Sequence, residues 1–159
     1  MGRFRKSFTV KLDIKTKEIR HSETKFPELK IQSGIFSDTR HYAKNITAQG
    51  LYSILLYGTK DGRIPGRNVL DFANKYIEDN KERFVEVYLK NKDDIQNAGQ
   101  IIGTDINNKH KMLVYGFTSP SNAPSTIKRK GRNDPLVDTG MLVKSLAFSI
   151  NGKGRHGKG

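Results

Sequence analysis

Near both ends of the chain, hydrophobic and polar residues alternate one by one. Residues 7–14 carry an apolar side chain at every second position, which is the period of a strand with one buried face. Residues 28–36 predict a second strand, in which Gly34 indicates a bulge. Residues 146–150 predict a last strand by the same alternation. The polar stretch between the first two strands is expected to be a loop.

In the centre of the chain, apolar residues recur at every third or fourth position, which is the period of an α-helix. This spacing predicts helices over residues 68–89 and 92–112. Residues 45–57 hold enough large apolar side chains for a buried helix. Near the end of the chain, Asp138 is expected to cap a short helix that extends through Lys144.

Glycine and proline separate these elements, and residues 58–67 and 117–137 are expected to be irregular. The order of strands and helices predicts an α+β fold, a small antiparallel sheet with packed helices and basic extended termini. We expect a single domain over residues 1–150. The last segment, 151–159, reads NGKGRHGKG. It is expected to be a flexible basic tail unless a partner binds it, because it has no apolar side chain to bury.

The composition excludes several classes of protein. A length of 159 residues suits one domain. The chain has no cysteine, which rules out disulfides, Cys-ligated zinc and thiol nucleophiles. No apolar run approaches the roughly 18 residues of a membrane-spanning helix, and the opening residues lack the apolar region of a secretory signal. We therefore expect no membrane among the partners.

Positive charge is concentrated at the two ends of the chain. The net charge is +13, of which +5 falls on residues 1–30, +6 on residues 128–159 and only +2 on the stretch between them. Charge of this kind attracts polyanions. Basic tails that only aid solubility are the alternative interpretation.

One short segment holds the densest group of cations. We expect it to contact DNA phosphates or an acidic partner. It contains no aromatic residue, so base stacking is not indicated and any contact with nucleic acid should be blind to base sequence. The cluster consists of Lys128, Arg129, Lys130 and Arg132.

Motifs that carry chemistry are missing from the sequence. The four histidines have no spacing typical of a metal-ligand pair on one helix face. Gly58, Gly62 and Gly66 are spaced like a phosphate-binding loop, but the Gly-Lys-Ser/Thr ending of such a loop is absent. No serine has an identifiable base and orienting group beside it in the sequence. We therefore expect no enzyme activity, no metal and no cofactor.

Three stretches of the chain carry motifs whose order and spacing are specific. The first joins LKIQSGIF at 29–36, HYAKN at 41–45 and LYGT at 56–59. The second is GRIPGR at 62–67. The third joins APSTI at 123–127, a Lys-Gly pair at 130–131 and PLVDTGML at 135–142. This third stretch is the most specific of the three.

Together these stretches resemble the bacteriophage virion-morphogenesis, or tail-completion, protein family over about residues 29–150. The resemblance implies a structural component of the virion neck, which is assembled in the host cytoplasm and acts at the head–tail junction. It implies a ring of identical subunits, expected to be a hexamer, around the DNA channel. The implied partners are other copies of the chain, the tail tube or tail terminator, the head-closure or connector proteins, and DNA phosphates in the channel.

The resemblance also implies a set of assembly residues within the second and third stretches. We expect them to shape the protomer and its ring contacts rather than to perform chemistry. Two other functions stay open: a free sequence-nonspecific nucleic-acid-binding protein, which would explain the charge, and an enzyme whose site forms only in space. The implied assembly residues are Ile64, Pro65, Arg67, Leu136, Asp138, Thr139, Gly140 and Leu142.

Overall fold

The computed structural model describes residues 9–15, 26–36, 41–43, 46–137 and 140–157. Within these residues the chain forms a four-stranded antiparallel sheet, a separate two-stranded ribbon and six helices. The prediction of an α+β fold with a small antiparallel sheet and packed helices is confirmed.

The main sheet has the strand order β1-β2-β5-β6, so the two ends of the described chain lie in one sheet. Leu12 pairs with Ile31, and Ile31 pairs with Ile150. Because paired residues point to the same side of a sheet, these three side chains share the buried face. The strands are β1 (Thr9–Ile14), β2 (Leu29–Gly34), β5 (Ala147–Ile150) and β6 (Lys153–His156).

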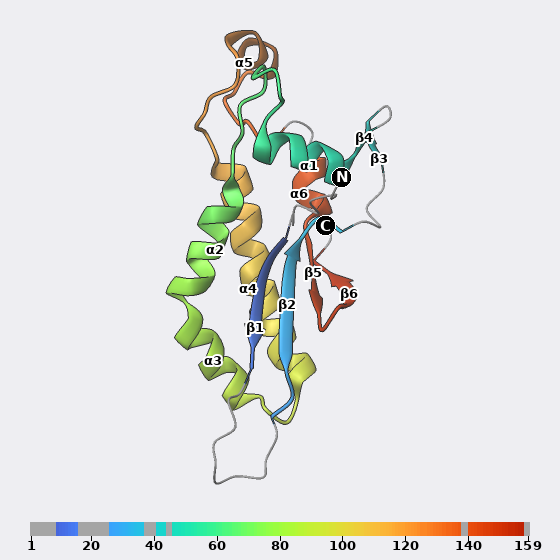
Figure 1. The fold of residues 1–159 in the computed structure, drawn as a ribbon, viewed down its shortest axis with the longest axis vertical. Coiled ribbons are helices and arrows are strands. Elements are labelled where there is room, and N and C mark those ends of the chain that lie inside the picture. The colour runs from blue at the N-terminus through green and yellow to red at the C-terminus, as the bar shows by residue number, and fades with distance from the viewer. Residues whose placement is uncertain (1–8, 16–25, 37–40, 44–45, 138–139, 158–159) are drawn as a thin grey trace.

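Helices cover that buried face of the sheet. The long helix α4 lies behind β2 and β5, and α2 and α3 run beside it (Figure 1). Helix α1 sits above the sheet next to α6, and it follows directly on the ribbon of β3 (His41–Ala43) and β4 (Ile46–Thr47). The helices are α1 (Ala48–Tyr57), α2 (Val69–Asp79), α3 (Lys81–Lys90), α4 (Ile95–Gly116), α5 (Pro124–Lys130) and α6 (Met141–Ser145).

Two glycines of α4 allow this helix to lie close against the sheet. A Cβ atom at Gly99 would lie 2.7 Å from Cγ2 of Ile150, and a Cβ atom at Gly103 would overlap the ring of Phe148. Because neither glycine has a side chain, the two large side chains of β5 fill the space against the helix backbone. The backbone of α4 therefore packs directly against the side chains of β5.

The helices expected over 68–89 and 45–57 differ from the observed ones. The first is divided into α2 and α3 at Asn80, whose φ and ψ are −111° and 10°. The side-chain amide of Asn80 donates to the carbonyl of Tyr76 at 2.9 Å and so competes with the helical backbone. The second begins only at Ala48, because Thr47 caps it by accepting a hydrogen bond from the Gly50 amide at 3.0 Å.

Helix α5 lies in the region expected to be irregular. Pro124 occupies the first turn, where its missing N–H removes no helical hydrogen bond. Gly131 ends the helix with a φ of 70° and donates its N–H to the carbonyl of Ile127 at 2.8 Å. Pro124 therefore starts a helix in a region where the prolines were expected to prevent one.

The expectation of a flexible tail over 151–159 is wrong for Lys153–His156, which form β6. Asn151 and Gly152 have φ angles of 49° and 74° and make a two-residue turn between Ile150 and Lys153, which is the geometry that Asn-Gly favours in hairpins. Gly154, at a φ of 73°, is the additional residue of a bulge before His156 pairs with Phe148. Turn chemistry therefore orders a segment that has no apolar side chain.

Candidate interaction surface at the basic tip

Two segments that are far apart in the sequence meet at one end of the molecule. Residues 58–68 connect α1 to α2, and residues 118–137 run from the end of α4 through α5 (Figure 1). We call these two segments together the tip lobe. They contain seven lysines and arginines against two carboxylates. The tip lobe therefore holds a net charge of +5.

Arg67 holds the two segments of the tip lobe together. Its side chain is buried, and its guanidinium donates to the carbonyls of Pro120 at 2.7 Å, Ser121 at 2.9 Å and Pro65 at 3.3 Å. Burial lowers the pKa of Arg67 from its ordinary value. Since three carbonyl dipoles replace the water around this cation, Arg67 is a structural connection and not an exposed contact residue.

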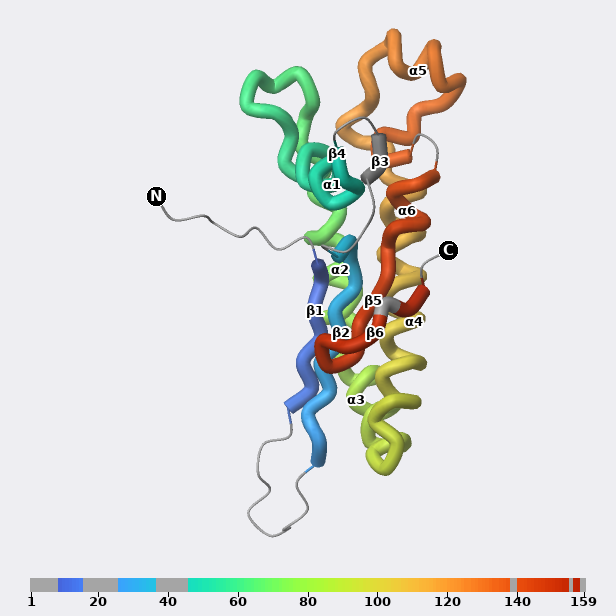
Figure 2. Tube along the Cα trace, turned by 90° about the vertical axis from the view of Figure 1, so that its right-hand side faces the viewer, coloured from blue at the N-terminus to red at the C-terminus, as the bar shows by residue number. Residues whose placement is uncertain are grey.

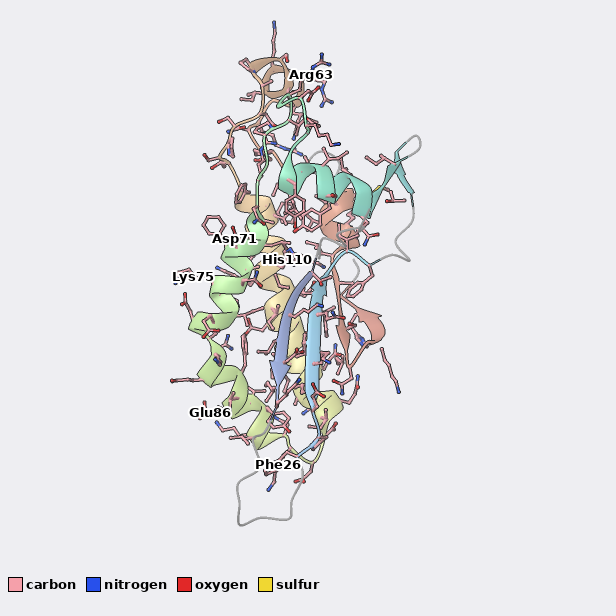
Figure 3. The ribbon with its side chains drawn as sticks, viewed as in Figure 1. Phe26, Arg63, Asp71, Lys75, Glu86 and His110 are labelled. Carbon is pink, nitrogen blue, oxygen red and sulfur yellow. The ribbon has the colours of Figure 1, made fainter. Side chains whose placement is uncertain are left out.

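The connection between α1 and α2 is a closed loop. Thr59 donates its hydroxyl to Asp61 at 2.6 Å and accepts the Ile64 N–H at 3.0 Å. The hydrogen bond from Thr59 lowers the pKa of the Asp61 carboxyl. Gly58 has a φ of 75°, and a Cβ there would lie 2.6 Å from the Ile64 carbonyl oxygen. This geometry presents Arg63 outward at the far end of the molecule (Figure 3).

The structure divides the cation cluster predicted from the sequence. Lys130 donates its ammonium group to the carbonyls of Asp134, at 2.7 Å, and Val137. Arg132 forms an ion pair with Asp134 at 2.6 Å. Lys128 and Arg129 are exposed on α5. Lys130 and Arg132 therefore bond within the lobe, and three of the four residues, all except Lys130, are exposed.

The same surface contains two cations that the sequence reasoning missed. Lys60 and Arg63 are exposed in the loop between α1 and α2, and Arg63 pairs with Asp61 at 3.2 Å. Among the described residues, no carboxylate forms an ion pair with Lys60, Lys128 or Arg129. The net charge of +2 on residues 58–68 can be counted in the sequence. That these residues lie next to α5 appears only in the folded structure.

The residues of the implied assembly motif occupy different environments. Ile64 is exposed and Pro65 is half-buried in the tip lobe, whereas Leu136 and Leu142 are buried. Gly140 precedes α6 with a φ of 80°, a conformation that favours glycine. Asp138 and Thr139 lie outside the described residues, and so does the proposed cap by Asp138. Of the placed motif residues, only Ile64 offers a large apolar side chain to a partner.

We call the main sheet and the helices packed on it, α1 to α4 and α6, the body. A second polar cluster lies inside the body, near the upper end of the sheet (Figure 3). The hydroxyl of Tyr52 lies 2.7 Å from Nε2 of His110, and Ser33 Oγ lies 3.2 Å from its Nδ1. Ser33 donates to Asn107 Oδ1 at 2.9 Å, so its oxygen is left to accept a hydrogen bond from Nδ1–H of His110. Nε2 then accepts from Tyr52.

All four side chains of this cluster are buried. Burial lowers the pKa of His110 to about 4 and raises that of Tyr52, so the imidazole is neutral and one tautomer satisfies the whole chain of hydrogen bonds. Ser33 has no exposed surface, so it cannot meet a substrate. The cluster ties α1, β2 and α4 together and is structural.

Within the described ranges, no group of three His, Asp or Glu side chains is arranged to hold a metal ion. The helices found there are all too short or too polar to cross a bilayer. Comparison of the chain with models of protein families, with curated proteins and with solved structures finds no match. The tip lobe and the sequence motifs are therefore the features of the chain that point to a function.

Proposed function

We propose that this chain is a structural component of a bacteriophage neck, a ring-forming tail-completion protein that caps the tail and joins it to the head around the DNA channel. One observation carries the proposal. The second motif stretch, 62–67, and most of the third, 123–137, form a single lobe because Arg67 donates to the carbonyls of Pro120 and Ser121. Motifs that shape one common surface are what an assembly protein needs.

The chemistry of the tip lobe suits weak contact with phosphates or with an acidic neighbour. Lys60, Lys128 and Arg129 are exposed on a loop and a helix whose backbone is fixed by internal hydrogen bonds. Exposed cations gain affinity for DNA by releasing counterions, and this gain is independent of base sequence. A ring around a DNA channel would tolerate such basic segments, because phosphates in transit need weak contact that is blind to base sequence.

The proposed partners are other copies of the chain in a ring, expected to be a hexamer, together with the tail tube or tail terminator and the head-closure or connector proteins. The proposed location is the virion neck. Such a role needs no catalysis, because closed rings need only complementary surfaces on successive subunits. An apolar core is enough to hold those surfaces in place.

A complementation experiment tests this function. The gene is deleted from the phage or prophage that carries it and is supplied again in trans, as the wild type or as the double variant Asp138→Ala, Gly140→Val. We expect electron micrographs of lysates without the gene, or with the variant, to show filled heads and separate tails. Joined infectious particles in normal yield from the deletion would overturn the proposal.

A free sequence-nonspecific nucleic-acid-binding protein is the second candidate. The observation that favours it is the three tip cations without a carboxylate partner in the described part of the chain. Binding of the purified protein to unrelated DNA duplexes separates the two functions. Tight binding that weakens steeply with salt would favour the free DNA binder, whereas a neck subunit alone should bind weakly.

A further inference from the structure

The outer face of α4 has no charged residue. Helix α4 has 22 residues and, at 1.5 Å per residue, is about 33 Å long. Its outer side forms the right-hand edge of the body in Figure 2. We call its exposed residues the α4 face: Gln96, Asn97, Gln100, Ile101, Thr104, Asn108, Met112, Tyr115 and Gly116.

The charged side chains of α4 lie at its flanks and have partners within the chain. Asp105 pairs with Arg83 of α3 at 2.7 Å and accepts the hydroxyl hydrogen bond of Tyr76. Lys109 lies 5.2 Å from the centre of the Tyr76 ring. Lys111 donates to the carbonyl of Gly157. The three charged residues Asp105, Lys109 and Lys111 therefore bind other parts of the chain on either side of the α4 face.

The neighbouring helices show that this absence is not a general property of the surface. Nine of the twelve exposed residues of α2 and α3 are charged, and several pair along the helix, as Lys75 does with Asp79 at 2.9 Å. Asp71, Lys75 and Glu86 point to solvent from these helices (Figure 3). Over the chain as a whole, 28% of residues are charged, so an uncharged face along one long helix is a distinct feature.

We propose that the α4 face is one side of the contact between successive copies of this chain. Ile101, Met112 and Tyr115 expose 47%, 66% and 53% of their surfaces there. Aromatic residues and methionine are enriched, and charged residues depleted, at the centre of protein interfaces. The amides and hydroxyl between them can donate and accept hydrogen bonds without a charged partner. The inference rests on the ring of the proposed function and names the surface that builds it.

Charge identifies a second copy as the occupant. Two chains with a net charge of +13 repel one another, so they can approach closely only where cations are missing. The α4 face lies beside α2 and α3, and residues 69–116, which contain these three helices, have eight carboxylates against seven cations. This side is therefore close to neutral, and a basic copy meets less repulsion there and an uncharged apolar centre. A phosphate or acidic partner would instead be drawn to the tip lobe.

Two matched asparagines allow a sharp test. Asn108 lies on the α4 face and Asn74 is exposed on α2. In sedimentation measurements, Asn108→Lys combined with Met112→Lys should weaken self-association about tenfold or more, because it adds cations where two basic chains meet. Asn74→Lys should leave self-association close to wild type. Unchanged thermal unfolding of each variant confirms that the fold is retained.

A cross-linking measurement complements the sedimentation test. Because the chain has no cysteine, Asn108→Cys and Asn74→Cys each give one site for a photoreactive benzophenone maleimide. We expect linked dimers from position 108 and few from position 74. A ring that is unaffected by the lysines and is not linked through 108 would overturn this inference and leave the proposed function standing. A chain that stays monomeric and unlinked at its solubility limit would overturn both.

Discussion

The body and the tip lobe of this protein are stabilised by different interactions. In the body, α4 packs so closely on β5 that the ring of Phe148 lies where a Cβ of Gly103 would be. In the tip lobe, α5 has no buried residue, and Arg67 and Lys130 donate to backbone carbonyls instead. The body therefore depends on shape and apolar area. The lobe joins that core only at its end, through Leu136 and Val137, and around α5 it depends on a few polar side chains.

The difference shows how a protein can keep a surface that is both basic and well defined. Cations that face solvent contribute little to folding, so they are available to a partner. Those that bond to carbonyls of the chain fix the loops that present the others. Since the two regions use separate interactions, a substitution in one should leave most of the other intact.

The largest effect is expected from filling the space at Gly103. In Gly103→Leu, the new side chain meets the Phe148 ring, and overpacking of this kind should lower the free energy of unfolding by about 3 kcal/mol or more. Urea unfolding measures the change. Gly116→Ala is the control, because nothing lies within 4 Å of a Cβ there. Equal stability of the two variants would contradict the close packing of α4 on β5.

Acid should weaken the body through His110. The pKa of His110 is about 4 in the fold and about 6.5 in the unfolded chain. Between these values the unfolded state binds more protons, so stability decreases as pH falls from about 6.5 to 4, by about 3 kcal/mol from this residue. Unfolding of the wild type and of His110→Gln across this range isolates the contribution. Parallel pH profiles would show that His110 is not the buried neutral group described here.

Removal of the Arg67 connection should loosen the lobe more than the body. Arg67→Met leaves the carbonyls of Pro120 and Ser121 without their donors, which costs about 2 kcal/mol. Hydrogen exchange at the α5 amides should become faster while the amides of β2 and α4 keep their protection. Arg63→Met, at an exposed side chain, should change neither. Equal loss of protection in lobe and body would remove the distinction between the two regions.

The smallest effect on folding is expected at the outer cations. Replacing Lys60, Lys128 and Arg129 together by glutamine should change the free energy of unfolding by less than about 1 kcal/mol, because all three are exposed. If they contact phosphates in DNA, the slope of log affinity against log salt should decrease by about 3. Titration of duplex DNA at several salt concentrations measures this slope. An unchanged slope would show that these three residues do not contact DNA phosphates.

Elements with a clear local period were predictable. The alternation of residues 7–14 appears as Thr9–Ile14 in the described part of that stretch, and the helical stripe through Ala98, Ile102 and Ile106 is buried on α4. Local chemistry that was overlooked accounts for two errors. The Asn-Gly pair at 151–152 indicates a hairpin, and Pro124 with Gly131 delimits a helix.

The sequence could not predict which cations bond within the chain and which face solvent. Lys128 and Lys130 are two positions apart, yet one faces solvent and the other donates to two carbonyls. Arg67 was expected to be an assembly residue, and its burial depends on Pro120, which is 53 positions away. Long-range hydrogen bonds of this kind do not correspond to any regular spacing of residues in the sequence.

The sequence by itself determined the α+β class, the long central helix and the basic character of the chain, because hydrophobic period and charge are properties of neighbouring residues. Only the tertiary structure decided which cations remain free, that Lys60 and Arg63 join α5 in one lobe, and that the exposed residues of α4 carry no charge. A surface collects residues from distant parts of the chain, so its composition emerges only when those parts are packed together.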